Sequence, residues 1–294
     1  MQAKELTQNL SIQGSTPIRI KMTSDYLHLP WYSRLLIHMK PLIKFPVRFT
    51  EEQEPPPIPF LKSVWHRWKA GNPVSRQVPV LVDNTTATAA LQRPMDLGAD
   101  FVLLSISKFL AGNGTLLGGA VVGPEGFIED IRWNTTEFIG AIMQPMEAWM
   151  TLQYLETLPM RMEKHSANTM AVAQYLKNHP KVVHVNYSGL IDHPQHDLAC
   201  RQMNGHGGLL SFVVKGGMEG AATVMNSLKM IVHAVTFGTS RTICMHPPTI
   251  THEHLTPKER LKAGIDDGLI RLSVGLENPE DLMSDFDQAL AHLI

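Results

Sequence analysis

The sequence predicts an α/β protein with a mainly parallel sheet in its middle part and a smaller α+β region at its C-terminal end. Two short apolar, β-branched runs, residues 78–82 and 101–104, predict buried strands of a parallel sheet. A helix signal over 91–97 lies between them and ends at Gly98. Apolar residues then recur at three- or four-residue spacing over 141–165, which predicts a long helix.

The C-terminal part mixes helix and strand patterns. Helical spacing is present over 167–176 and 279–293, and strand patterns over 182–185 and 209–214. We therefore expect an atypical N-terminal segment (1–76), a sheet domain (77–150) and a C-terminal domain (151–294). The charged, proline-rich stretch 51–59 within the first segment is typical of a loop or linker.

Composition is that of a water-soluble enzyme of up to two domains. The chain has 294 residues, 44% of them hydrophobic, and a formal net charge of -1, which argues against a nucleic-acid or anionic-membrane partner. The first residues lack the apolar core of a signal peptide, and no apolar run could span a bilayer, so we expect a cytoplasmic protein. Cys200 and Cys244 are too few and too far apart for a disulfide framework or a zinc ribbon.

Asp83 and Lys108 each follow a predicted strand. If the strands are parallel neighbours, both side chains lie at the carboxyl edge of the sheet, where open α/β sheets place ligands. A lysine amine can form a Schiff base with an aldehyde, and a carboxylate can keep a pyridine nitrogen protonated. Pyridoxal 5'-phosphate (PLP) requires these two groups. The alternative is that Asp83 caps the next helix and Lys108 is a solvated surface lysine.

Five motifs occur in the order found in one enzyme family. The chain resembles the Cys/Met-metabolism PLP-dependent enzymes, which include cystathionine γ-synthase, cystathionine γ-lyase, methionine γ-lyase and O-acetylhomoserine sulfhydrylase. The resemblance is nearly continuous from about Val78 to the C-terminus. It implies a fold type I PLP-dependent transferase, here with an incomplete large cofactor domain and a smaller α+β C-terminal domain. The motifs are Val82-Asp83-Asn84-Thr85, Ser105-Ile106-Ser107-Lys108, the glycine-rich stretch 112–119, the stretch 205–212, and Arg271-Leu272-Ser273-Val274-Gly275.

The resemblance implies a cofactor role for four of these residues. Lys108 would be the catalytic residue that binds PLP covalently, and Asp83 would face the pyridine nitrogen. Ser105 and Ser107 would supply hydroxyls to the cofactor phosphate, which suits small donor groups. The alternative for the two serines is that they are ordinary residues at a strand end.

Substrate binding is implied for Arg271 and Thr236. A guanidinium in a strand can hold a carboxylate through two parallel hydrogen bonds, and the family's arginine at this motif holds the substrate's α-carboxylate. Thr236-Phe237-Gly238 aligns with the family's Ser-Leu-Gly, whose serine assists at that carboxylate. The alternative for Arg271 is a structural ion pair.

The N-terminal segment departs most from the family. Tyr32 and Arg34 look like the family's Tyr-x-Arg, which reaches the phosphate of a neighbouring subunit, so the resemblance implies a homo-oligomer, a dimer or tetramer. The family's glycine-rich phosphate turn and its ring-stacking tyrosine, which lie in a longer segment before Val-Asp-Asn-Thr, have no match in this chain.

The implied activity belongs to sulfur amino-acid metabolism (transsulfuration). A lyase or transferase of this family makes or breaks a C–S bond by γ-replacement or γ-elimination on a sulfur-containing or O-acylated homoserine-type amino acid. Residues 112–115 resemble the sulfhydrylases and 121–125 the lyases, which leaves the reaction open. The alternative is a shortened homologue that is catalytically impaired or non-catalytic and acts only with, or as a remnant of, a complete subunit.

Three histidines near the C-terminal end, His246, His252 and His254, have the spacing of a zinc-binding segment. No cysteine or carboxylate spacing completes a ligand set there, and the family has a similar stretch without a metal. We therefore expect no metal site.

Overall fold

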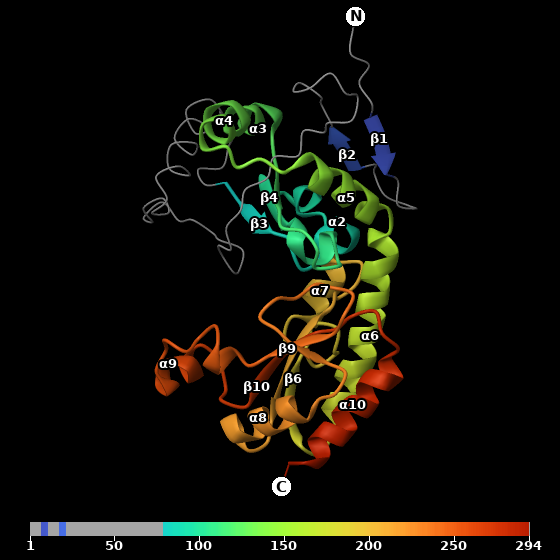
Figure 1. Cartoon of the computed structure of the whole chain (residues 1–294), viewed down its shortest axis with the longest axis vertical. Coiled ribbons are helices and arrows are strands. Elements are labelled where there is room, and N and C mark those ends of the chain that lie inside the picture. Colours follow the sequence, from blue (N-terminus) through green and yellow to red (C-terminus); the bar gives the residue numbers. More distant parts are fainter. Residues whose placement is uncertain (1–6, 11–17, 22–78, 294) are drawn as a thin grey trace, which may run out of the picture. The chain divides into compact units, whose positions relative to one another are not determined.

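The computed structural model describes residues 7–10, 18–21 and 79–293 (Figure 1). The chain forms two compact units. Tyr32 and Arg34 lie outside the described residues, as does most of the expected 1–76 segment. Of the described residues, unit 1 includes 79–85, Pro94–Ile106 and Leu116–Glu156, and unit 2 includes Thr86–Arg93, Ser107–Thr115 and 157–293.

Two strands are described near the N-terminus. β1 (Thr7–Leu10) pairs antiparallel with β2 (Ile18–Lys21), with Thr7 opposite Lys21 and Leu10 opposite Ile18.

Unit 1 contains a three-stranded sheet in the order β3-β4-β5. β3 (Leu81–Asp83) and β4 (Phe101–Ser105) are parallel neighbours, with Asp83 opposite Leu103, so the condition set for Asp83 and Lys108 to follow adjacent strands is met. β5 (Gly119–Val122) instead runs antiparallel to β4, with Gly119 opposite Ser105. A parallel return requires a crossover to the far end of the sheet. Here β5 begins at Gly119, beside Ser105 at the end of β4, so the sheet contains one parallel and one antiparallel pair.

The helix expected over 91–97 is wrong in extent. Proline has no amide hydrogen, so an α-helix that reached Pro94 could not continue its hydrogen bonds there. The chain therefore forms a short α2 (Thr88–Leu91) and a separate 3-10 turn, η1 (Pro94–Leu97). Gly98 follows with φ at 91°, a conformation that favours glycine and ends the turn as expected.

The long helical zone expected over 141–165 consists of two helices. α5 (Pro145–Glu156) ends unit 1, and α6 (Leu158–Asn178) begins after Thr157. Pro159 stands in the first turn of α6, a position where its missing amide hydrogen costs nothing. The helix expected over 167–176 is the second half of α6. The other helices of unit 1 are α3 (Glu125–Ile131), the π-helical turn η3 (Arg132–Thr136) and α4 (Glu137–Ile139).

Unit 2 is built on a five-stranded sheet in the order β6-β7-β10-β9-β8. All pairs are antiparallel except β8 with β9. This arrangement agrees with the predicted α+β region. The strands are β6 (Val182–Asn186), β7 (Leu209–Val214), β8 (Val232–His233), β9 (Ile243–Met245) and β10 (Leu269–Ser273).

Three helices pack against one face of this sheet: α6, α8 (Gly217–Ser227) and α10 (Pro279–Ala291) (Figure 1). Along β7 the side chains of Leu210, Phe212 and Val214 are buried while their neighbours are half-buried, the two-residue period of a strand with one covered face. Phe212 meets Phe286 of α10 edge to face, with ring centroids 5.6 Å apart and both rings fully buried. Removing either ring would cost about 3–5 kcal/mol.

The same two-residue period fixes where the polar residues of β10 lie. Ile270 and Leu272 point into the core under the helices, so Arg271 and Ser273 lie on the opposite face. Two short helices, α7 (His196–Gln202) and α9 (Pro257–Lys262), and the 3-10 turn η4 (Pro247–Thr249) complete unit 2.

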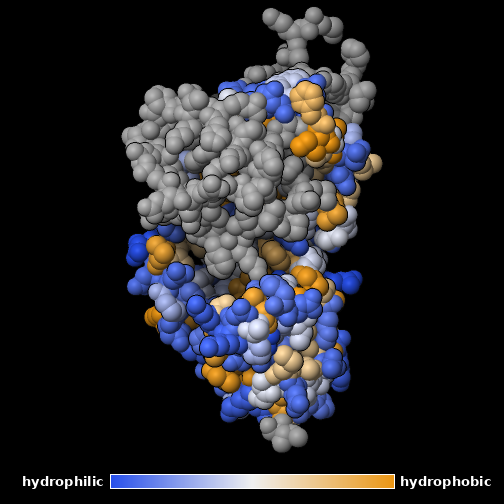
Figure 2. All heavy atoms as spheres, turned by 90° about the vertical axis from the view of Figure 1, so that its left-hand side faces the viewer, coloured by the Kyte–Doolittle hydropathy of each residue, from blue (hydrophilic) through white to orange (hydrophobic). Residues whose placement is uncertain are grey.

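Within the described ranges, no helix is both long and apolar enough to cross a bilayer. The face of unit 2 visible in Figure 2 is mainly hydrophilic, with scattered apolar side chains. Such single exposed apolar residues are usual on a surface that faces water.

Candidate functional site

Lys108 lies in a short helical turn, η2 (Ile106–Leu110), that directly follows β4. The turn is not regular, because the backbone of Lys108 itself leaves the helical region. Its carbonyl accepts a hydrogen bond from the amide of Gly112 at 2.8 Å, and the carbonyl of Gly112 accepts one from Ser240 at 2.8 Å. These bonds connect the lysine segment of unit 2 to the loop before β9.

Arg161 of α6 anchors the same segment from another side. Its guanidinium donates to the carbonyl of Phe109 at 2.7 Å and to that of Leu110 at 2.9 Å. A Cβ on Gly112 would overlap this guanidinium, so the close approach requires glycine. The two carbonyls end a short helical turn and would otherwise lack partners within it.

The side chain of Phe109 fixes the segment by packing. It is fully buried, and its ring meets His165 of α6 edge to face with centroids 5.0 Å apart. Burial lowers the pKa of His165 to about 4, so this imidazole is neutral near pH 7, and its Nδ1 bonds to the carbonyl of Val274 at 2.7 Å. The neutral ring therefore packs against Phe109, the residue that follows Lys108.

The Lys108 amine contacts the segment that follows β8. Its Nζ donates to Oγ1 of Thr236 at 2.7 Å and lies 4.7 Å from the centroid of the Phe237 ring. A cation over an aromatic face is attracted by the electron density of the ring. No described carboxylate pairs with this amine, so a hydroxyl and a ring are the described groups that position it.

Arg271 reaches the same segment from β10. Its Nη2 donates to the carbonyls of Val235 and Thr236 at 3.0 and 2.8 Å, and its guanidinium carbon lies 5.4 Å from the Phe237 centroid. The Nε is buried and has no hydrogen-bond partner among the described residues. No described carboxylate pairs with Arg271, so the ion-pair alternative is not observed within these residues.

Gly238 allows the segment to approach Lys108 closely. Its φ is 78°, and a Cβ there would lie 2.7 Å from the backbone nitrogen of Phe109 and 3.1 Å from the Cβ of Lys108. Its amide donates to the hydroxyl of Ser273, which is fully buried, at 2.9 Å. β10 thus holds residues 235–238 at two points, and these residues hold the lysine.

The electrostatics of the site make Lys108 easier to deprotonate than a surface lysine. Burial, and to a lesser degree the positive charge of Arg271, lowers the pKa of Lys108 below its ordinary value. Burial also lowers the pKa of Arg271, which still leaves a guanidinium charged at neutral pH. A half-buried amine with a lowered pKa is a better nucleophile than a surface lysine.

The structure brings together three of the residues singled out from the sequence, Lys108, Thr236 and Arg271, all in unit 2. Ser107 also belongs to unit 2 and is half-buried beside Lys108 in the chain. Ser105 ends β4 in unit 1, where its amide donates to Oγ1 of Thr85 at 2.8 Å.

Asp83 is exposed at the end of β3 in unit 1. Its Oδ1 accepts the amide of Thr85 at 3.0 Å, a local turn, and the N-cap of α2 is Ala87, so Asp83 does not cap that helix. Tyr32 and Arg34 lie outside the described residues.

Hydrogen bonds occupy ring nitrogens of His246 and His252, two of the three histidines whose spacing is that of a zinc-binding segment. Both ring nitrogens of His246 are engaged, Nδ1 with Thr249 at 2.9 Å and Nε2 with the carbonyl of Asp267 at 2.8 Å. Nδ1 of His252 bonds to Thr251 at 2.8 Å.

Four residues that shape the site were not predicted from the sequence: Arg161, Phe237, Gly238 and Ser273. The last three lie inside or beside the two motifs that pointed to Thr236 and Arg271, so those motifs carried the signal. Arg161 lies 53 residues after Lys108 in a helix with several charged residues, and no local pattern distinguishes it.

Comparisons with known proteins agree with these motifs. A family model described as "Cys/Met metabolism PLP-dependent enzyme" matches residues 67–291. The chain is 44% identical over 216 residues to an L-methionine gamma-lyase of Treponema denticola, which covers 73% of this chain and 54% of that protein. It is 42% identical to an O-succinylhomoserine sulfhydrylase of Pseudomonas aeruginosa, over 72% of this chain and 52% of that protein.

A solved structure extends the likeness to the fold. The crystal structure of a cystathionine gamma-lyase from Micromonospora echinospora matches with a TM-score of 0.70 at 33% identity, over 73% of this chain and 56% of the other. The chain therefore spans about half the length of the relatives it matches.

Proposed function

The chain belongs to the Cys/Met-metabolism PLP-dependent enzyme family, and from this premise we propose that Lys108 binds PLP covalently in an enzyme of sulfur amino-acid metabolism. The enzyme makes or breaks a C–S bond by γ-replacement or γ-elimination. One observation carries the proposal: the amine of Lys108 is half-buried, positioned by Thr236, and has a pKa lowered by burial and by Arg271.

The chemistry of the donor set fits this cofactor. An aldehyde reacts with an unprotonated amine, which the lowered pKa of Lys108 favours. The described part of the chain places no carboxylate against Lys108 that would hold its proton. The family resemblance supports Asp83 as the partner of the pyridine nitrogen and Ser105 and Ser107 as residues that bind the phosphate. Tyr32 and Arg34 would complete the phosphate site from a neighbouring subunit.

PLP, when bound, supplies an aldehyde that takes up amines and a ring that withdraws electrons from the adjacent carbon. The residues of this chain do the rest. Lys108 would accept and return protons through its amine, and Thr236 would hold its Nζ in one position. Arg271 would bind the substrate carboxylate through its guanidinium.

Arg271 also fixes its own geometry for this task. Its Nη2 is held by two carbonyls of the segment 235–236, which limits rotation of the guanidinium plane. A fixed donor loses little side-chain entropy when a carboxylate arrives. The substrate class is a sulfur-containing or O-acylated homoserine-type amino acid, and the protein is expected to be a cytoplasmic homo-oligomer with the domain division 1–76, 77–150 and 151–294.

A second candidate is a homologue that keeps the lysine site but turns over substrate only beside a complete subunit. The observation in its favour is that the chain spans about half the length of its relatives. The two candidates share the cofactor site and differ in the activity of the isolated chain.

Titration with PLP and a turnover assay test the proposal together. The purified chain should bind one PLP per chain and turn yellow. Lys108→Arg should not, because an arginine keeps the positive charge beside Phe237 but forms no Schiff base with the aldehyde. Lys215→Ala, at an exposed lysine between β7 and α8, is the matched control and should behave as wild type.

Methionine, cystathionine and O-acylated homoserine are the substrates to offer. Product from the isolated chain supports the enzyme. PLP binding at Lys108 without product supports the second candidate. Equal PLP binding by wild type and Lys108→Arg contradicts both.

A further inference from the structure

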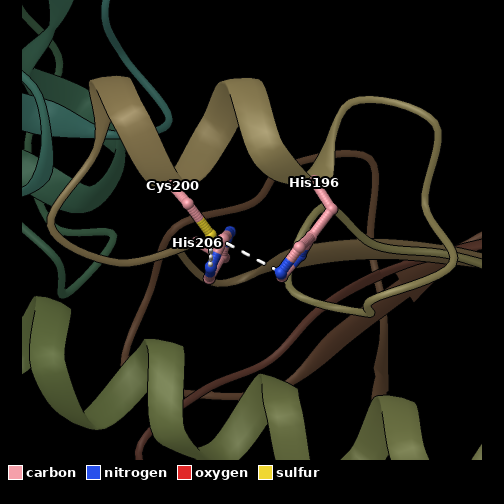
Figure 3. Close-up of side chains that lie close together, drawn as sticks. All are labelled: His196, Cys200 and His206. Carbon is pink, nitrogen blue, oxygen red and sulfur yellow. Dashed lines mark hydrogen bonds between the residues drawn. The ribbon is translucent and has the colours of Figure 1, made fainter.

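Three potential metal ligands converge in unit 2, apart from the residues that position Lys108 (Figure 3). His196 and Cys200 come from α7 and His206 from the loop before β7. The Cys200 Sγ lies 3.5 Å from Nε2 of His196 and 3.9 Å from Nε2 of His206. The three ligand atoms all lie within 4.8 Å of one another.

The sequence spacing explains part of this convergence. His196 and Cys200 are four residues apart, so one turn of α7 places them on the same helix face. His206 returns to that face after the helix ends. Its ring stacks on that of His196 with an interplanar angle of 14° and centroids 5.6 Å apart, while the ring of Tyr187 meets it from another side at 6.1 Å.

Ser188 orients both imidazoles. Its carbonyl accepts from Nδ1 of His196 at 2.9 Å, and its hydroxyl lies 3.3 Å from Nδ1 of His206. With Nδ1 engaged in each ring, Nε2 is left to face the sulfur. Metal-binding histidines have this arrangement, in which a carbonyl or other polar group holds the nitrogen that does not bind the ion.

The distances match a tetrahedral ion of the zinc class. Zinc bonds of about 2.3 Å to sulfur and about 2.0–2.1 Å to nitrogen hold a sulfur and a nitrogen ligand about 3.6 Å apart. The two observed S···N distances, 3.5 and 3.9 Å, bracket this value. An ordinary packing contact between a thiol and two imidazoles does not require both Nε2 atoms to face the same sulfur.

We infer that His196, Cys200 and His206 bind a divalent ion of the zinc class, with three protein ligands and a fourth position open to solvent. Cys200 is exposed, which leaves room for a water or an external ligand at that position. Thiolate and imidazole ligands select zinc-like ions over magnesium or calcium, which prefer oxygen. This site was not expected from the sequence, where the spacing of the two cysteines and of the histidines after residue 245 indicated no metal site.

Cobalt titration tests the site in the full chain, prepared reduced, stripped with a chelator and free of any histidine tag. We expect one Co²⁺ per chain, with visible bands of four-coordinate cobalt and a near-ultraviolet thiolate band, and displacement by Zn²⁺. Cys200→Ser should abolish the thiolate band and weaken binding at least tenfold, as should His206→Gln. Ser188→Ala, which removes the hydroxyl on His206, should weaken binding about tenfold.

His254→Gln is the matched control, because it removes an exposed histidine of the rejected cluster. It should bind as wild type, and so should Lys108→Ala, which separates this site from the proposed PLP site. Binding that is absent, or that survives Cys200→Ser with its thiolate band unchanged, overturns the inference.

A second measurement needs only the wild type and does not depend on the folding of a variant. Bound Zn²⁺ should slow alkylation of Cys200 by iodoacetamide at least tenfold, measured by mass spectrometry of the modified peptide. Buried Cys244 should stay unmodified with and without Zn²⁺, which checks that the protein remains folded during the reaction. Equal alkylation of Cys200 with and without Zn²⁺ also overturns the inference.

Discussion

Replacing Arg161 by methionine should release the Lys108 segment, because this side chain joins α6 to the turn that carries the lysine. Methionine keeps most of the aliphatic bulk and removes both hydrogen bonds to the carbonyls of Phe109 and Leu110, at 2.7 and 2.9 Å. A hydrogen bond from a charged donor contributes about 1.5–3 kcal/mol, so two contribute at most about 3–6 kcal/mol.

Relaxation of the turn and access of water to the released carbonyls reduce that figure. We expect Arg161→Met to lower the free energy of unfolding by about 2–4 kcal/mol, a large share of the ~5–15 kcal/mol of a typical domain. Urea denaturation followed by circular dichroism measures this loss. Arg241→Met is the matched control, because Arg241 is exposed, and it should change the stability by less than about 0.5 kcal/mol.

Arg161→Met should also slow PLP attachment under native conditions, since the amine of Lys108 is no longer held against Thr236. A loss of stability no greater than that of Arg241→Met, together with an unchanged rate of PLP attachment, would show that Arg161 does not hold the Lys108 segment.

Three further changes probe the site and its support. Gly238→Ala places a Cβ 2.7 Å from the backbone of Phe109 at a φ of 78°, so it should lower the free energy of unfolding in urea by about 2–4 kcal/mol. Gly126→Ala is the control, because the space around Gly126 is open, and it should not lower the stability. Equal effects of the two changes would contradict the close approach at Gly238. Arg271→Met removes a positive charge that lowers the pKa of Lys108, so PLP attachment as a function of pH should shift to higher pH, and a shift to lower pH contradicts this electrostatic account. Burial opposes ionisation of Asp285, but hydrogen bonds from three backbone amides and one side chain leave its pKa below the ordinary value. The stabilisation by this carboxylate is therefore present above about pH 4 and is lost as the pH falls further. Asp285→Asn should be less stable than wild type at pH 7 and approach wild type in acid, and a stability difference that does not depend on pH would contradict this.

The parts of the fold that local patterns determine could be predicted. The strand pair β3–β4 follows from two short β-branched runs, and α10 from its apolar period and the Asn278-Pro279 start. The break between α5 and α6 was missed, although Pro159 marks it, because the apolar period continues across Thr157. The antiparallel direction of β5 depends on where the chain returns, which no local pattern specifies.

The candidate site divides in the same way. Lys108, Thr236 and Arg271 stand in motifs, so the sequence could point to each of them. Their meeting depends on the register of β10 with its neighbours and on the close approach at Gly238, and these are tertiary facts. Ser188, which orients two histidines, had no signal in the sequence, because a serine in a loop usually has no special role.

Peptide mapping after borohydride reduction shows directly whether Lys108 is the lysine that binds PLP. The full chain is incubated with PLP, reduced, digested and analysed by mass spectrometry for the mass of the fixed cofactor. The account predicts one PLP per chain on the peptide that contains Lys108, and none on that peptide in Lys108→Arg. Fixation spread over exposed lysines such as Lys215, with no preference for Lys108, would contradict it.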